Sequence, residues 1–153
     1  MTQHLNYYWR LIATGICFAL FGLGGIILSV FVFPVLNALP KKSAIDNKHL
    51  SRGASYARWI IHRSFKLLIQ LMQYLGIMRC EIIGEHILKE CRHTLVLANH
   101  PTLLDVVALI SFMPAASCVV KQALWKNLFV GLAVRTANYI SNAQPEQLID
   151  DCT

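Results

Sequence analysis

Residues 11–40 read LIATGICFALFGLGGIILSVFVFPVLNALP and contain no charged side chain. A helix needs about 20 consecutive apolar residues to cross the hydrocarbon core of a bilayer, and this stretch exceeds that length. A cleaved signal peptide is the alternative, but its apolar region is only about 7–15 residues long. The stretch therefore predicts a transmembrane or deeply inserted helix within an N-terminal membrane anchor, which we place at residues 1–45.

Both flanks of the apolar stretch are typical of a membrane boundary. Residues 7–10, YYWR, form an aromatic and basic group at one end, and Lys41 and Lys42 mark the other. Between Lys41 and Arg79 there are eight Lys or Arg residues, opposed only by Asp46. This block favours the phosphate head groups of anionic lipids.

The distribution of charge also predicts a topology. Positive residues concentrate on the cytoplasmic side of membrane helices, so the remainder of the chain is expected on the cytoplasmic face of an inner membrane. A second topology is left open, because a hairpin that bends at residues 22–25, GLGG, would return the chain to the face from which it started.

Composition agrees with a membrane protein. The chain is 56% hydrophobic and 14% charged, with a formal net charge of +6, a balance that is unusual for a soluble domain. Nucleic acid is not expected as a partner, since no RNP-like or zinc pattern accompanies the basic block. The five cysteines are scattered without a CxxC pair, so neither a metal site nor a closed disulfide framework is predicted and a reduced setting fits best.

Residues 50–76 predict an amphipathic helix within a region that we bound at 46–78. Polar residues recur at three- and four-residue steps on one side, and the remaining surface is broad and apolar; the polar positions are Arg58, His62, Lys66, Gln70 and Gln73. Such a helix either lies in the membrane interface or packs on the domain's own core, and both alternatives stay open. His62 is expected to be solvated.

After Gly76 the periodicity changes to short apolar runs, which predict strands. These runs are RCEIIGEHIL at 79–88, HTLVLANH at 93–100, ASCVVKQ at 116–122 and ANYISN at 137–142. Helices are expected between them at 101–113 and 122–136. Alternating strands and helices are typical of an α/β domain, here at residues 79–153, preceded by the transmembrane helix and the amphipathic helix.

The segment VLANHPTLLDVVALI, residues 96–110, carries the candidate chemistry. Asp105 follows His100 by five positions, and within one continuous helix that step would rotate the two side chains about 140° apart. If His100 instead lies in the turn before a helix that starts at Pro101, Asp105 can accept a hydrogen bond from Nδ1 and leave Nε2 as a base. The H-x4-D spacing alone is weak evidence, and its context after an apolar strand adds to it.

The eight residues ANHPTLLD, 98–105, resemble the NHxSxxD block of the glycerolipid acyltransferases, a family that includes the lysophosphatidate acyltransferases. The resemblance implies that His100 deprotonates an acceptor hydroxyl, which attacks the thioester of acyl-CoA or acyl-carrier protein, while Asp105 orients the imidazole. It also implies that Asn99 and Thr102 bind substrate, that the membrane lipid and a lysolipid acceptor are partners, and that neither a metal nor another cofactor is needed.

A second similarity to this family lies in residues 119–142, where the family has a Lys, a helix, a Gly and a short strand. The resemblance implies that Lys121 contributes positive charge near the phosphate or the acyl donor, and that Asn142 contacts the acceptor. The alternative for Lys121, a solvated lysine at the end of a strand, stays open. In lysophosphatidate acyltransferases an acidic residue and a phosphate-binding Arg end this strand, whereas Ser141 and Asn142 stand here. Because Asn cannot neutralise a phosphate, an amino-acid lipid or another hydroxylated lipid is also a plausible acceptor.

A third family block, Glu-Gly-Thr/Ser-Arg, has no counterpart, since no Glu in the chain precedes a Gly. Its expected place lies beyond Thr153, so we expect an acyltransferase-like domain that is incomplete at its C-terminus. The alternative function is a non-catalytic membrane-anchored protein or an inactive fragment. In that case His100 is a helix-capping or core histidine, and Asp105 is a first-turn acid stabilised by the helix dipole.

Overall fold

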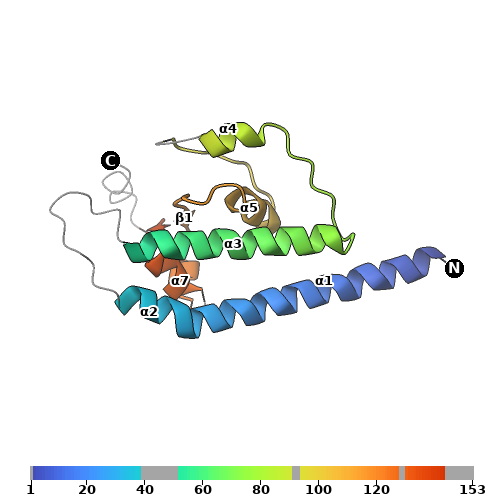
Figure 1. The fold of residues 1–153 in the computed structure, drawn as a ribbon, viewed down its shortest axis with the longest axis horizontal. Coiled ribbons are helices and arrows are strands. Elements are labelled where there is room, and N and C mark those ends of the chain that lie inside the picture. The colour runs from blue at the N-terminus through green and yellow to red at the C-terminus, as the bar shows by residue number, and fades with distance from the viewer. Residues whose placement is uncertain (1, 39–51, 91–93, 128–129, 144–153) are drawn as a thin grey trace. The chain divides into compact units, whose positions relative to one another are not determined.

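The computed structural model describes residues 2–38, 52–90, 94–127 and 130–143 (Figure 1). These residues are mostly helical, with one small parallel sheet. The helices are α1 (Thr2–Ile27), the π-helical turn η1 (Leu28–Val32), α2 (Phe33–Ala38), α3 (Arg52–Tyr74), α4 (Glu85–Glu90), α5 (Leu103–Ile110), α6 (Gln122–Trp125) and α7 (Gly131–Thr136), and the strands are β1 (Val119–Val120) and β2 (Ile140–Ser141).

The two long predicted helices are confirmed, but only two of the four predicted strands are formed. The strand expected at 79–88 is wrong, because this segment has no ladder partner among the described residues and turns into α4. The described part of 93–100 also has no regular structure, and Leu95 and Leu97 stay 77% and 87% exposed. An apolar alternation becomes a strand only where a neighbouring strand completes its hydrogen bonds. The α/β acyltransferase fold therefore stays a prediction.

The chain divides into two compact units, Met1–Gly22 with Ile61–Pro114 and Leu23–Ile60 with Ala115–Thr153. The core of the first unit contains residues from α1, α3 and α5. Its buried members are Cys17, Leu68, Ile69, Met72 and Val107. Full burial of each large aliphatic side chain contributes about 1.5–3 kcal/mol relative to exposure, so this cluster is the main attachment of α1 and α5 to α3 within the unit.

Helix α3 ends in a glycine C-cap. Gly76 adopts a φ of 69°, a left-handed conformation that glycine reaches without steric cost. The Ile77 N–H then donates to the Met72 carbonyl and the Gly76 N–H to the Gln73 carbonyl, both at 3.0 Å, which is the Schellman pattern. The Ile77 carbonyl also accepts a hydrogen bond of 2.6 Å from Arg10 Nη2.

Helix α1 is continuous through residues 22–25, so the hairpin bend that these glycines permitted is not formed. The helix widens into a π-turn at η1, where the Phe33 N–H bonds to the Leu28 carbonyl. Pro34 follows directly and has no N–H to offer the previous turn, which is a common cause of such a local change. The helical stretch Tyr7–Ala38 is long and apolar enough to cross a membrane.

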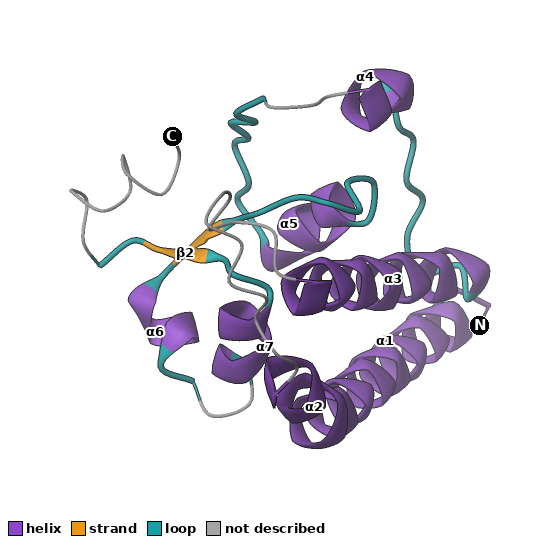
Figure 2. Ribbon diagram, turned by 60° about the vertical axis from the view of Figure 1, so that its left-hand side comes forward, coloured by secondary structure: helices purple, strands orange, loops and turns teal. Residues whose placement is uncertain are grey.

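The second unit contains the β1–β2 pair, with α6 and α7 in the connection between its strands (Figure 2). The strands are parallel, and Val119 is opposite Ile140. The Nε of Arg58, on α3, donates to the Ala137 carbonyl at 2.8 Å, which ties the start of α3 to the end of α7. The sequence predicted one helix at 122–136, between two predicted strands. The structure instead has two short helices there, α6 and α7, and residues 128 and 129 between them lie outside the described residues.

Replacing Gly131 with alanine is expected to destabilise the protein. A Cβ at this position would lie 2.5 Å from the Trp125 carbonyl oxygen, a backbone atom that cannot rotate away. We expect a loss of about 1–3 kcal/mol in the free energy of unfolding, measured by denaturation in detergent. The matched control is Gly22→Ala, where nothing lies within 4 Å of the added Cβ and helix propensity predicts a small gain. Equal stability of the two variants would contradict the close contact at Gly131.

Candidate functional site

The first candidate residues lie at the start of α5, where Thr102 and Asp105 form a capping box. Thr102 adopts an extended conformation, and its Oγ1 accepts from the Asp105 N–H at 3.4 Å. The Asp105 Oδ2 accepts in return from the Thr102 N–H at 2.9 Å and from Thr102 Oγ1 at 2.8 Å. These bonds satisfy backbone donors that a helix start leaves open. They make α5 begin at Leu103, whereas the sequence predicted Pro101.

His100 precedes this cap and is exposed. Its Nδ1 lies 3.1 Å from the Ala98 carbonyl oxygen. A carbonyl oxygen only accepts, so in the neutral ring Nδ1 carries the hydrogen and Nε2 holds the lone pair. The expected hydrogen bond from Nδ1 to Asp105 is not formed among the described residues, because Nδ1 is directed to Ala98 and the carboxylate is bonded by Thr102. A hydrogen bond to Asp105 was expected to fix the tautomer with the hydrogen on Nδ1, and the contact with Ala98 selects that same tautomer.

The charge of Asp105 is stabilised by its surroundings. The backbone N–H of Thr102 holds the pKa of the Asp105 carboxyl below its ordinary value, and the Thr102 hydroxyl lowers it further. The positive form of His100 adds a smaller lowering through charge attraction. Asp105 is therefore an anion at neutral pH that acts on His100 through space.

This lowered pKa predicts that α5 loses stabilisation in acid. Because the folded-state pKa of Asp105 is below the unfolded value, the contribution to stability is present above the ordinary value of 3.8 and is lost as the pH falls through the folded-state pKa. We expect the free energy of unfolding of the native chain to fall toward that of Asp105→Asn between pH 5 and pH 2, as measured by chemical denaturation. If the free energies of unfolding of the native chain and of Asp105→Asn differed by the same amount across this pH range, Asp105 would not be the group that stabilises α5.

The other two predicted residues of this segment are both exposed. Asn99 directly precedes His100 in the segment that leads into the cap. The hydroxyl of Thr102 is engaged with Asp105 in both directions, so it has a structural role that the resemblance did not imply. Substrate binding by Asn99 and Thr102 stays a prediction.

Lys121 and Asn142 belong to the second unit, where the structure brings them to the same end of the β1–β2 pair. The Asn142 N–H donates to the Val120 carbonyl at 3.0 Å, and its Oδ1 accepts from the Gln122 N–H at 3.0 Å. Lys121 is the N-cap residue of α6 and is exposed. The side-chain oxygen of Asn142 thus holds the start of α6, while its amide nitrogen is able to donate to a ligand.

His62 contradicts the expectation of a solvated side chain. It is only 9% exposed, and its Nδ1 lies 3.0 Å from the Ile110 carbonyl oxygen at the end of α5. The periodicity of α3 placed His62 among polar residues and contained no sign that α5 packs over it. Within the part of the chain that the structure describes, no group of three His, Cys, Asp or Glu side chains is arranged to hold a metal ion.

The capping box of Thr102 and Asp105 could have been predicted from the sequence, whereas the contact between His100 and the Ala98 carbonyl could not. The T-x-x-D spacing of Thr102 and Asp105 is a capping-box pattern and was available as a signal. The Ala98 carbonyl has no such signal, because any residue supplies a carbonyl.

No known family model, curated protein or solved structure matches the chain. The geometry defines an exposed histidine beside an anionic carboxylate at the start of a helix, in a chain with a helix able to cross a membrane.

Proposed function

We propose that the protein is a membrane-associated acyltransferase of the glycerolipid type. It moves a fatty acyl group from acyl-CoA or acyl-carrier protein to the hydroxyl of a lysolipid, at the cytoplasmic face of an inner membrane. The observation that carries the proposal is the hydrogen bond from His100 Nδ1 to the Ala98 carbonyl. It leaves an exposed Nε2 as a base, directly before the helix that bears an anionic Asp105.

Acyl transfer needs a group that accepts and then returns one proton. Nε2 of His100 takes the proton of the acceptor hydroxyl while the hydroxyl oxygen bonds to the thioester carbonyl carbon. The carbon–sulfur bond of the resulting tetrahedral intermediate then breaks, and the imidazolium protonates the leaving thiolate. The products are an ester and a free thiol, and the histidine returns to its starting form. No protein nucleophile is required.

Asp105 supports this reaction through its charge. While Nε2 holds the proton, His100 carries a positive charge, and a nearby carboxylate lowers the energy of that state. The hydrogen bonds from Thr102 are the main reason for the lowered pKa of Asp105, and the attraction to His100 adds a smaller lowering. In the Ser-His-Asp type of site the carboxylate also orients the ring; here Ala98 supports that orientation instead.

The acceptor is a hydroxylated lysolipid, of either the lysophosphatidate type or the amino-acid-lipid type. Ser141 and Asn142 stand where a phosphate-binding Arg is expected, and Asn142 Oδ1 is bonded to the Gln122 N–H. An amide nitrogen can donate to a carbonyl or carboxylate of an amino-acid lipid but cannot neutralise a phosphate. Lys121 and Arg135 are exposed cations of the same unit, and they keep lysophosphatidate among the acceptors to be tested.

The proposal is tested by mass spectrometry of lipids formed by the full chain in phospholipid vesicles. Each of two donors, acyl-CoA and acyl-carrier protein, is supplied with lysophosphatidate, an amino-acid lysolipid or a neutral hydroxylated lipid. We expect one acceptor class to be acylated, with one thiol released for each ester formed. Vesicle-bound, folded chain that acylates no acceptor with either donor would contradict the proposal.

One observation favours a second candidate, a non-catalytic membrane protein. The capping box gives Thr102 and Asp105 a complete structural role that requires no chemistry. In that case acyl donors are not consumed, and His100→Ala leaves every property of the chain unchanged. The vesicle assay separates the two candidates, because only the acyltransferase forms an ester.

A further inference from the structure

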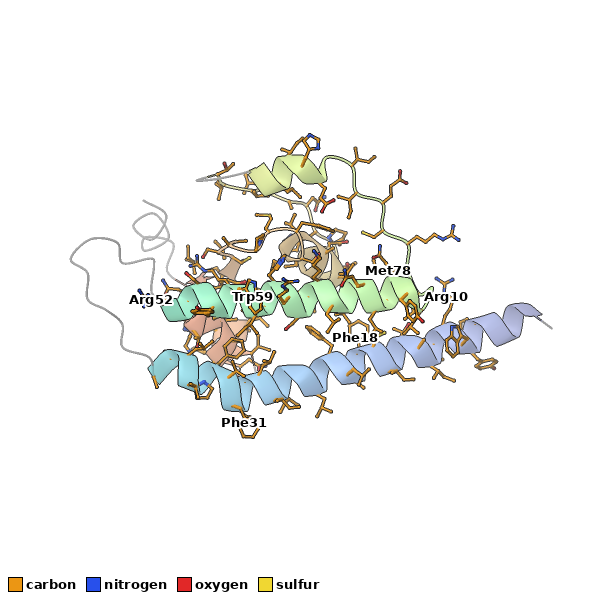
Figure 3. The ribbon with its side chains drawn as sticks, in the orientation of Figure 1. Arg10, Phe18, Phe31, Arg52, Trp59 and Met78 are labelled. Atoms are coloured by element: carbon orange, nitrogen blue, oxygen red, sulfur yellow. The ribbon has the colours of Figure 1, made fainter. Side chains whose placement is uncertain are left out.

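The orientation of α1 relative to a membrane follows from its contacts in the first unit. Arg10, near the start of α1, donates to the Ile77 carbonyl just beyond the end of α3. Figure 3 shows Arg10 directed from α1 toward the chain near Met78. Arg10 therefore lies at the end of α3, and within this unit the two helices run antiparallel.

The next contacts fix how far the two helices stay together. Cys17 packs with the α3 residues Leu68 and Met72 in the core. One turn further along α1, the rings of Phe21 and Phe65 lie 5.7 Å apart. Helix α3 thus packs alongside α1 along the entire stretch from Arg10 to Phe21.

These contacts conflict with a helix that crosses the bilayer. From Arg10 to Phe21 a helix rises about 16 Å, roughly half of the 30 Å thickness of the hydrocarbon core. If Arg10 marked the boundary, Lys66, the neighbour of Phe65, would lie near the bilayer centre. Lys66, Gln70 and Gln73 are exposed on the face of α3 opposite the core, and charged or polar side chains at that depth are costly. The four-carbon stem of a lysine is too short to reach the head groups from there.

The exposed surface of α1 in this unit has the character of a surface that inserts into lipid. Side chains that point away from the core are apolar and about half exposed, and they are Leu11, Ile12, Ile16, Phe18 and Leu20. Residues 7–9, two tyrosines and a tryptophan, are also more than half exposed, as is typical of the interface between acyl chains and head groups.

We infer that this part of α1 lies in the plane of one leaflet instead of crossing the bilayer, with its apolar side chains among the acyl chains and Lys66 at the head groups. Charge supports the choice of a lipid surface over a protein, since no acidic residue lies between Asp46 and Glu81. A helix with a wide apolar surface and basic flanks is the form that binds anionic membrane interfaces. The inference concerns membrane attachment alone and does not depend on catalysis.

The experiment measures the depth of three positions on the exposed face of α1 in the full chain. A fluorophore is attached to single cysteines that replace Ile12, Ile16 or Leu20, with the native cysteines replaced by alanine. Quenching by lipids brominated at different depths in anionic vesicles gives the depth of each probe. We expect all three probes at one shallow depth in one leaflet. A probe at Gln70, on the exposed face of α3, is expected to be quenched by a water-soluble quencher.

A transmembrane helix gives the opposite profile, in which the depth increases by about 12 Å from residue 12 to residue 20. That gradient would overturn the inference, and so would a failure of the folded chain to bind the vesicles. Oriented circular dichroism of the unmodified chain in stacked bilayers is the second measurement. Helices parallel to the membrane plane keep the 208 nm band and support the inference, whereas loss of that band overturns it.

Discussion

Replacing His100 with alanine is expected to lower kcat/KM for acyl transfer by about 10²–10⁴-fold, the usual contribution of a general base. The reason is that Nε2 is the atom that the Ala98 contact leaves unprotonated and exposed. The measurement is the initial rate of acylated lipid formation in vesicles. His86→Ala is the matched control, because His86 is also exposed but lies on α4, and its rate is expected to equal that of the native chain.

An asparagine at position 100 separates the basic role of His100 from a structural one. The asparagine amide nitrogen is two bonds from Cβ, as Nδ1 is, so it can donate to the Ala98 carbonyl, but the amide cannot accept a proton at neutral pH. We expect His100→Asn to be as inactive as His100→Ala while both unfold like the native chain. Retention of activity in the asparagine variant would show that His100 serves only to shape the turn before α5.

The second large effect is expected at Asp105. Asp105→Asn removes the negative charge but keeps an oxygen that can accept from the Thr102 N–H, so the cap is largely preserved. We expect kcat/KM to fall by about 10²-fold, since the imidazolium loses its stabilising charge. The same rate assay measures it, with the free energy of unfolding determined in parallel.

Thr102→Ala is the matched variant for Asp105→Asn. It removes the side chain of the cap, at a cost of about 1 kcal/mol in stability, but leaves the Asp105 carboxylate charged. We therefore expect Thr102→Ala to lose stability and to raise KM through the lost substrate contact while kcat is largely retained, whereas Asp105→Asn lowers kcat. If the two variants lost activity in proportion to their lost stability, Asp105 would act only through the helix cap.

The fold was predictable where periodicity extended over many residues. The apolar stretch at 11–40 and the amphipathic pattern at 50–76 both correspond to helices, because a long repeat identifies a helix from its own chain alone. An apolar run forms a strand only where a neighbouring strand pairs with it, and the pattern of one run does not reveal that neighbour. ASCVVKQ and ANYISN pair with each other, whereas the runs at 79–88 and 93–100 have no ladder in the described residues.

The candidate site was predictable in its residues but not in its bonds. Sequence reasoning placed His100 in the turn before the helix and Asp105 inside the helix, as the structure does, although the helix begins at Leu103 and not at Pro101. It assigned the carboxylate to His100, whereas Thr102 lies closer along the chain and supplies two donors to Asp105. The burial of His62 depends on how α5 packs on α3, and such packing cannot be derived from the periodicity of α3.

In the proposed reaction His100 takes the proton of the acceptor hydroxyl, and this role is tested by chemical rescue. Acylated lipid is measured for the native chain and His100→Ala, with and without added imidazole, and the lipid acylated by imidazole without protein is subtracted. We predict that His100→Ala is inactive alone and regains acceptor-dependent ester formation with imidazole, which leaves the native rate unchanged. Ester formation by His100→Ala at the native rate without imidazole would contradict the claim.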